Sequence, residues 1–147
     1  MLYVCGMSTD NKTTITVEST IAAPAAKVWE YWTAPEHITQ WCQASDDWHA
    51  PAAEQDLRAG GAFKTVMAAK DGSAAFDFTG VYTSVEAPRH IAYTIADGRQ
   101  VSVTFTEQGA TTRVTETFEP ESINPPEMQQ AGWQAILDNF RKYTESH

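Results

Sequence analysis

The chain has 147 residues and a formal net charge of -9 at neutral pH, which predicts one domain with an acidic surface. Such a surface repels phosphate groups, so neither nucleic acid nor an anionic membrane is expected as a partner. No apolar run is long enough to span a bilayer, and the opening residues lack the basic flank of a secretion signal. The two cysteines, Cys5 and Cys42, predict no disulfide framework, which favours a reducing cytoplasm.

The first elements in chain order are expected after a flexible tail at residues 1–12. Alternation and β-branched residues over Thr13–Ile21 predict a strand. The period then becomes helical, and prolines in first-turn positions indicate two short helices in tandem, Pro24–Thr33 and Pro35–Cys42. Thr33 and Glu36 have the spacing of a capping box at the start of the second helix.

The middle of the chain alternates between apolar and polar residues, and turn signals such as Asp-Gly and Gln-Gly interrupt the alternation. These breaks predict six strands, at Glu54–Leu57, Ala62–Ala69, Ala74–Glu86, His90–Ala96, Gln100–Glu107 and Thr111–Glu119. One face of these strands is apolar and the other is rich in Thr and Ser, as in an antiparallel sheet covered on one side.

The cover is expected to be a long C-terminal helix. Asn124 is its expected N-cap, and an apolar stripe runs from Met128 to Tyr143. The whole pattern predicts an α+β fold in a single domain over residues 13–147. In this fold a curved antiparallel sheet of six to seven strands wraps around the long helix. A hollow remains between them, and the two short helices after the first strand close one mouth of it.

The order of elements and several sequence segments resemble a known family. The segments are "ITVESTIAAPAAKVWEYWTAPEHITQW", "DLRAGGAF", "DFTGVY" and "GWQAILDNFRKY", which together extend from Ile15 to Tyr143. They resemble the START-like (SRPBCC, birch-pollen-allergen-like) superfamily of helix-grip folds. Within it, the chain is similar to small bacterial proteins like the C-terminal domain of the activator of heat-shock-protein-90 ATPase. The resemblance implies a cavity for apolar or amphipathic small molecules, and in some branches aromatase/cyclase or hydrolase chemistry.

The segment "WCQASDDWHAP", Trp41 to Pro51, concentrates residue types that bind metals or transfer protons. Its metal-binding types, together with two residues downstream, are Asp46, Asp47, His49, Glu54 and Asp56. Their spacing matches no metal motif, so neither a metal nor another cofactor is expected. Asp47 and His49 lie two residues apart in an extended segment, so both could face the cavity as an acid–base pair.

Two other interpretations of this segment stay open. Ser45 and Asp46 could stabilise a turn, with Trp48 packed as a plug at the cavity mouth. Alternatively, His49 or Asp47 could contact the polar end of a ligand. Cys42 is not expected to be a nucleophile, because its position at the C-terminal end of a helix disfavours the thiolate.

Glu116 is a further catalytic candidate. If Val114 and Phe118 face the core, Glu116 faces it with them. A carboxylate there would have a raised pKa or would need a partner. A β-bulge in the last strand would instead turn Glu116 to water. Asp77 alternates with Phe76 and Phe78 and is expected to face solvent.

The expected ligand-binding residues are large apolar side chains on the inward face, although most of them could equally be ordinary core. They are Trp32, Trp41, Trp48, Phe63, Met67, Phe76, Phe78, Tyr82, Tyr93, Phe105, Met128 and Trp133. The function expected first is binding of a small apolar or aromatic molecule by a monomer or weak homodimer. The alternatives are a cyclase- or hydrolase-type enzyme that uses a cavity carboxylate, and a module that interacts with a chaperone.

Overall fold

The computed structural model describes residues 14–43 and 45–147. The tail expected at residues 1–12 therefore lies outside the described residues, as does Thr13. The described part contains, in chain order, β1 (Ile15–Ile21), α2 (Ala25–Thr33), α3 (Pro35–Trp41), β2 (Trp48–Gln55), β3 (Ala62–Ala69), β4 (Ala75–Glu86), β5 (His90–Ile95), β6 (Gln100–Gln108), β7 (Thr111–Phe118) and α4 (Pro126–Ser146). The α+β class expected from the sequence is confirmed.

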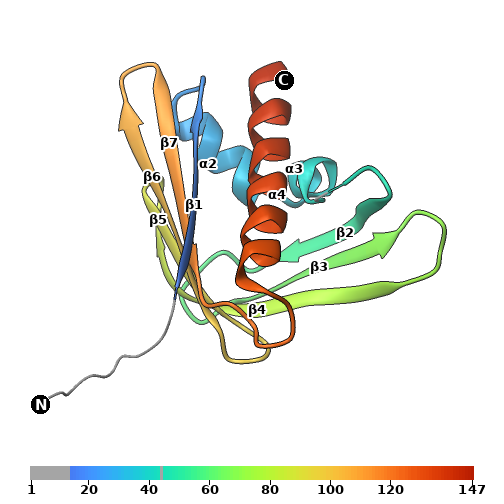
Figure 1. Ribbon diagram of the computed structural model, residues 1–147. Helices are drawn as coiled ribbons and strands as arrows, with labels where there is room; N and C mark the ends of the chain where they lie inside the picture. The colour runs from blue at the N-terminus through green and yellow to red at the C-terminus, as the bar shows by residue number, and fades with distance from the viewer. Residues whose placement is uncertain (1–13, 44) are drawn as a thin grey trace, which may run out of the picture.

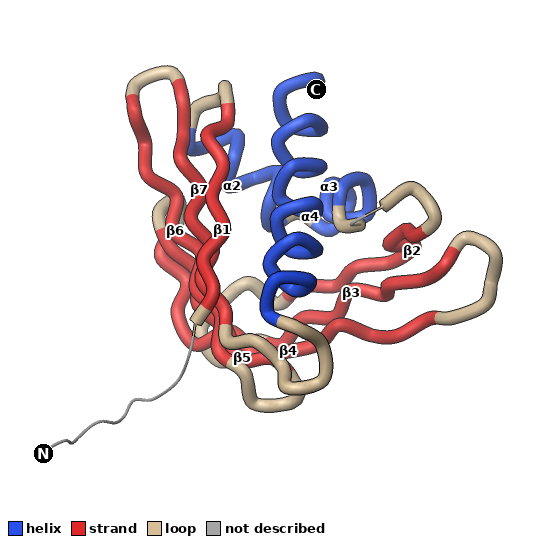
Figure 2. The backbone as a smooth tube through the Cα atoms, in the orientation of Figure 1, coloured by secondary structure: helices blue, strands red, loops and turns tan. Residues whose placement is uncertain are grey.

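The seven strands form one antiparallel sheet in the order β1-β7-β6-β5-β4-β3-β2. Strands β3 to β7 are neighbours through consecutive hairpins, whereas β1 pairs with β7, Ile15 lying opposite Phe118. Figure 1 shows β1, β7 and β6 on one side of α4, while β4, β3 and β2 pass beneath the helix toward its other side. The same bend is visible in the tube view of Figure 2. This is the helix-grip arrangement predicted from the sequence.

The core lies between the concave face of the sheet and the helices. Leu137 and Phe140 of α4 and Val28 of α2 are fully buried. From the sheet they meet Val17, Ile21, Ile91, Val103, Val114 and Phe118, which are also almost completely buried. Along β7 every second residue is buried, because successive side chains of a strand point to opposite faces. The alternation seen in the sequence thus defines which face of the sheet the helix covers.

The start of β2 differs from the prediction. The strand begins at Trp48 rather than Glu54 and ends at Gln55. Pro51 lies inside it, and the register shifts between His49 and Ala52. Proline is tolerated there because β2 is an edge strand, and a β-bulge accommodates the missing hydrogen-bond donor. Alternation is lost at the bulge, which is why the pattern of the sequence did not reveal the strand.

Both predicted helix caps are wrong. Ala34 is the N-cap of α3, and Thr33 instead ends α2, where its hydroxyl donates to the carbonyl of Trp29 at 2.8 Å. At α4 the N-cap is Pro125, without a side-chain cap. The side chain of Asn124 instead donates to the carboxylate of Glu121.

Candidate functional site

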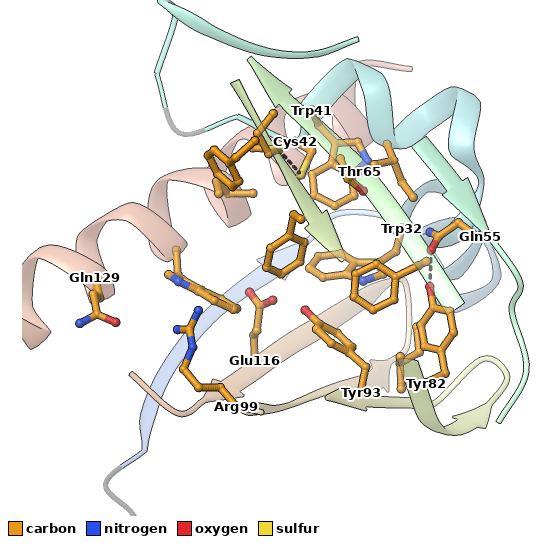
Figure 3. Close-up of a pocket in the computed structure, with 18 of the residues that line it drawn as sticks. Trp32, Trp41, Cys42, Gln55, Thr65, Tyr82, Tyr93, Arg99, Glu116 and Gln129 are labelled. Atoms are coloured by element: carbon orange, nitrogen blue, oxygen red, sulfur yellow. Dashed lines mark hydrogen bonds between the residues drawn. The ribbon is translucent and has the colours of Figure 1, made fainter. Parts of the chain in front are cut away.

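A cavity of about 310 Å³ lies between the concave face of the sheet, α4 and the pair α2–α3. Figure 3 shows side chains from all of these elements converging on it. Its wall is formed by Trp32, Ile38, Trp41, Cys42, Gln55, Phe63, Thr65, Met67, Phe76, Phe78, Tyr82, Ile91, Tyr93, Arg99, Glu116, Glu121, Gln129, Trp133 and Ile136. Most of these side chains are apolar, so the cavity is suited to excluding water from an apolar guest.

One wall of the cavity is an aromatic cluster on three neighbouring strands. The ring of Phe63 on β3 lies 5.2 Å from that of Tyr82 on β4 and 4.9 Å from that of Tyr93 on β5, measured between centroids. Gly80 makes this packing possible, because a Cβ at that position would lie 2.7 Å from the Phe63 ring. Glycine in a strand interior marks such a close approach. The cluster therefore depends on the absence of a side chain at Gly80 of β4.

The helices supply the opposite wall. Trp32 of α2 and Trp41 of α3 lie 5.0 Å apart between ring centroids, and both pack edge-on against Phe140 of α4. The indole N–H of Trp41 donates to the carbonyl of Tyr31 at 2.9 Å. Trp133 of α4 stacks on Phe118, with centroids 3.8 Å apart. These contacts hold each indole in one orientation, so the shape of this wall is largely preformed.

Glu116 brings a carboxyl group into this apolar environment. It is 6% exposed, and β7 pairs with β1 and β6 without a register shift, so no bulge turns it to water. Figure 3 shows its carboxyl directed into the cavity. Burial raises the pKa of Glu116 to about 8, because the charged form loses its hydration there. Of the two orientations of Glu116 that the sequence left open, the structure has the inward one.

Other polar groups of the wall are engaged with the protein. The hydroxyl of Tyr82 donates to the side-chain oxygen of Gln55, whose amide nitrogen donates to the carbonyl of Thr33 at 3.1 Å. This chain of bonds ties β4 and the end of β2 to the end of α2. Arg99, in the turn between β5 and β6, pairs with Asp97 at 2.8 Å.

Gln129 fastens the connection between β7 and α4. It accepts from the backbone N–H of Glu121 at 2.9 Å and donates to the carbonyls of Glu121 and Asn124. The carboxylate of Glu121 accepts bonds from Asn124 and Ile123, which lower its pKa. The start of the long helix is thereby held at the cavity's edge.

Cys42 lines the cavity as a thiol. Burial, and secondarily the charge of Glu116, raise its pKa to about 12. Its Sγ lies 4.0 Å from Sδ of Met67 as a weak donor. A thiol in this state is a poor nucleophile, which agrees with the expectation from its place at the end of a helix.

Nine of the twelve expected ligand-binding residues lie in the cavity wall, and Trp48, Phe105 and Met128 lie outside it. Trp48 begins β2 rather than lying in a loop, and its ring lies 6.0 Å from that of the wall residue Phe76. Phe105 is buried behind the wall, where Trp29 and Trp32 pack on it. Met128 is 60% exposed, because it lies on the solvent side of the first turns of α4.

The remaining candidates of the segment Trp41–Pro51 do not reach the cavity. Asp47 is exposed in the turn before β2, where it accepts a hydrogen bond from the hydroxyl of Ser45. His49 lies in β2 opposite Ala68 and is absent from the wall. Within residues 14–43 and 45–147, the structure contains no group of three His, Cys, Asp or Glu side chains that could hold a metal ion. Asp46, Glu54 and Asp56 therefore belong to no such group. Asp77 is exposed, as expected.

Several wall residues were not anticipated from the sequence. Gln129 could have been found, because it shares a helical face with Trp133 and Ile136 at spacings of four and seven. Arg99 and Gln55 carry no such signal. Arg99 follows a turn, and Gln55 ends a strand that was predicted at Glu54–Leu57 but lies at Trp48–Gln55.

Comparison with known proteins identifies the family. The family model of Activator of Hsp90 ATPase homolog 1-like proteins matches residues 22–145. The chain belongs to this family. A search among curated proteins found no match. In the part of the chain that the structure describes, no helix has the length and apolar character needed to cross a membrane.

Solved structures agree with this assignment. An AHSA1-like protein from Aeromonas hydrophila has a TM-score of 0.86 and 47% identity, over 91% of this chain and 93% of its own. A protein from Cytophaga hutchinsonii has a TM-score of 0.79 and 58% identity, over 90% of this chain and 92% of its own. A protein from Nitrosomonas europaea has a TM-score of 0.79 at 18% identity, over 94% and 97% of the two chains, and shows a shared fold alone.

Proposed function

We propose that this protein binds a small apolar or aromatic molecule in the cavity between the sheet and α4. The observation that carries the proposal is the cavity itself, a preformed space of about 310 Å³ with aromatic side chains on both walls. This volume lies at the lower end of the range of small-molecule sites, roughly 300 to 1,000 Å³. It suits a guest of one or two fused rings. We place this activity in the cytoplasm, in line with the cysteine content.

Proton transfer by Glu116 is the second candidate. A buried carboxyl with a pKa of about 8 can serve as general acid or general base near neutral pH. Glu116 would then act on a molecule that occupies the same cavity, so the enzymatic alternative also requires binding. The alternative of a chaperone-interacting module rests on the family's name.

Binding can be tested with a hydrocarbon probe, isopropenylnaphthalene, titrated into the protein while tryptophan fluorescence is followed. Trp32, Trp41 and Trp133 line the cavity, so occupancy is expected to quench or shift their emission. Thr65→Phe places a ring in the cavity from β3 and is expected to abolish the response. Thr106→Phe makes the same exchange on the exposed face of β6 and is the matched control.

Both variants are first checked for a folded state by circular dichroism and urea unfolding. Saturable binding that Thr65→Phe removes and Thr106→Phe retains supports the proposal. An absence of binding to the parent protein, or equal binding by both variants, contradicts it. Mass spectrometry of small molecules released from natively purified protein then identifies the class of the natural guest.

A further inference from the structure

Two titratable groups in the cavity wall have no hydrogen-bond partner within the described residues, and the hydroxyl of Thr65 in the same wall has none either. The carboxyl of Glu116 and the hydroxyl of Tyr93 belong to side chains that are 6% and 9% exposed. Neither group forms a hydrogen bond or ion pair with another described residue. Their polar atoms border the cavity, so a ligand that accepts from both groups would gain two hydrogen bonds in an apolar wall. The hydroxyl of Tyr82 differs, because Gln55 already satisfies it.

The sheet places the two groups in the same part of the cavity. Glu116 of β7 lies opposite Val103 of β6, which in turn lies opposite Ile91 of β5. Tyr93 follows Ile91 by two residues and therefore faces the same side. In Figure 3 the carboxyl and the hydroxyl both point inward from neighbouring positions. The carboxyl and the hydroxyl are also close enough to interact electrostatically, since after burial a charge on Glu116 is the next largest cause that raises the pKa of Tyr93.

At neutral pH both groups are hydrogen-bond donors. Burial raises the pKa of Glu116 to about 8 and that of Tyr93 well above its ordinary value, so each retains its proton. The other titratable or charged groups of the wall are Cys42 after α3, Tyr82 on β4, Arg99 before β6 and Glu121 before α4. The segments of the wall from α2, β2, β3 and α4 supply none.

The charges of these neighbouring groups restrict the charge that the polar end of the ligand can carry. A cationic head would require Glu116 to ionise in an apolar wall that also contains the guanidinium of Arg99. An anionic head would be held next to a carboxyl group that ionises only a little above neutral pH. A neutral head with a hydrogen-bond-accepting oxygen meets neither penalty and takes both donors at once.

We propose that Glu116 and Tyr93 jointly donate hydrogen bonds to the carbonyl oxygen of a neutral, otherwise apolar ligand. The inference rests on the proposed function, because it assumes that the cavity is the binding site. It adds the chemical class of the ligand's polar end and the two residues that recognise it. The aromatic walls hold the remainder of the molecule.

The test compares three probes of one shape. They are methyl naphthyl ketone, isopropenylnaphthalene, in which a methylene group replaces the oxygen, and naphthylethylamine, which carries an ammonium group. Each net hydrogen bond contributes about fivefold in affinity, so the ketone is expected to bind roughly 25-fold more tightly than the alkene. Calorimetry or tryptophan fluorescence gives the dissociation constants.

Variants separate the two donors. Tyr93→Phe and Glu116→Leu are each expected to reduce the ratio of ketone affinity to alkene affinity by about fivefold. Glu116→Gln keeps an N–H donor without a titratable proton. It should preserve the preference for the ketone while removing the pH dependence of binding. Tyr143→Phe removes a hydroxyl outside the cavity, which bonds His37, and is the matched control.

The parent protein is expected to lose ketone affinity as the pH rises through about 8, because Glu116 then loses the proton it donates. Equal affinities for ketone and alkene, unaffected by Tyr93→Phe, would overturn this inference and leave the proposed function intact. Tightest binding of the amine, lost on Glu116→Gln, would also overturn it. Failure of all three probes to bind would refute the proposed function itself.

Discussion

The buried carboxyl of Glu116 predicts that Glu116→Gln stabilises the protein at alkaline pH. The folded state holds the proton with a pKa of about 8, against 4.5 for the hydrated carboxyl of the unfolded chain. The folded state therefore binds this proton more tightly, and the resulting stability is complete below pH 4.5 and is lost as the pH rises to about 8. Glutamine cannot ionise, so the variant is spared this loss.

The magnitude follows from the difference between the two pKa values. From 4.5 to about 8 is 3.5 units, which corresponds to about 5 kcal/mol of unfolding free energy over the whole window. The advantage of Glu116→Gln over the parent should grow by about 1.4 kcal/mol per pH unit within the window and reach roughly 3 kcal/mol at neutral pH. Above the upper end of the window, the difference in unfolding free energy between Glu116→Gln and the parent should be constant.

Urea unfolding, followed by tryptophan fluorescence at a series of pH values, measures this difference directly. Other titrating groups are shared by both proteins, so their contributions cancel in the comparison. Glu107→Gln, an exposed residue of β6, is the matched control for exchanging a carboxyl for an amide. A difference between Glu116→Gln and parent that does not change with pH would refute the reasoning, since the carboxyl would then be hydrated or paired in the folded protein.

Two further predictions follow from the packing of the wall. Gly80→Ala is expected to lower the unfolding free energy by about 1 to 3 kcal/mol, measured by urea unfolding, because the new Cβ would lie 2.5 Å from the carbonyl oxygen of Thr94; an unchanged midpoint would contradict this close approach. Cys42, studied in a Cys5→Ser background, should react with iodoacetamide about 1,000-fold more slowly in the folded protein than in urea, since a pKa of about 12 instead of 9.0 removes most of its thiolate. Equal rates in both states would show an accessible, ordinary thiol.

The elements that sequence analysis located well are those whose period is unbroken. Strand β3 was expected at Ala62–Ala69 and is found there, since its apolar residues alternate without interruption between glycine turns. Strand β2 was largely missed because Pro51 and a bulge interrupt its alternation. The predictions of the helix caps were wrong for another reason. Thr33 has a competing acceptor in its own helix, the carbonyl of Trp29, and the spacing of residues does not reveal such competition.

The candidate site was predictable only in part, on similar grounds. Residue parity placed Phe63 on the inward face, because a strand has only two sides, and it left Glu116 either inward or turned to water by a bulge. Parity does not distinguish a side chain that borders empty space from one that is packed behind the wall, as Phe105 is. Arg99 lines the cavity because of the conformation of the turn between β5 and β6, which strand parity does not describe. Whether a cavity remains depends on the sum of all side-chain volumes between sheet and helix, which no local pattern contains.

The pairing of the first strand with the last also has a consequence for synthesis. Ile15 lies opposite Phe118, and among the strands that the structure describes β7 alone is a sheet neighbour of β1. At about 5 to 20 residues per second, the roughly hundred residues between these partners take on the order of 5 to 20 s to translate. During that interval the hydrogen-bonding edge of β1 and its apolar residues have no native partner. The nascent chain therefore passes through a period in which its first strand is available to other chains, and protection of that strand by ribosome-bound factors would affect the yield of folded protein more than its final stability.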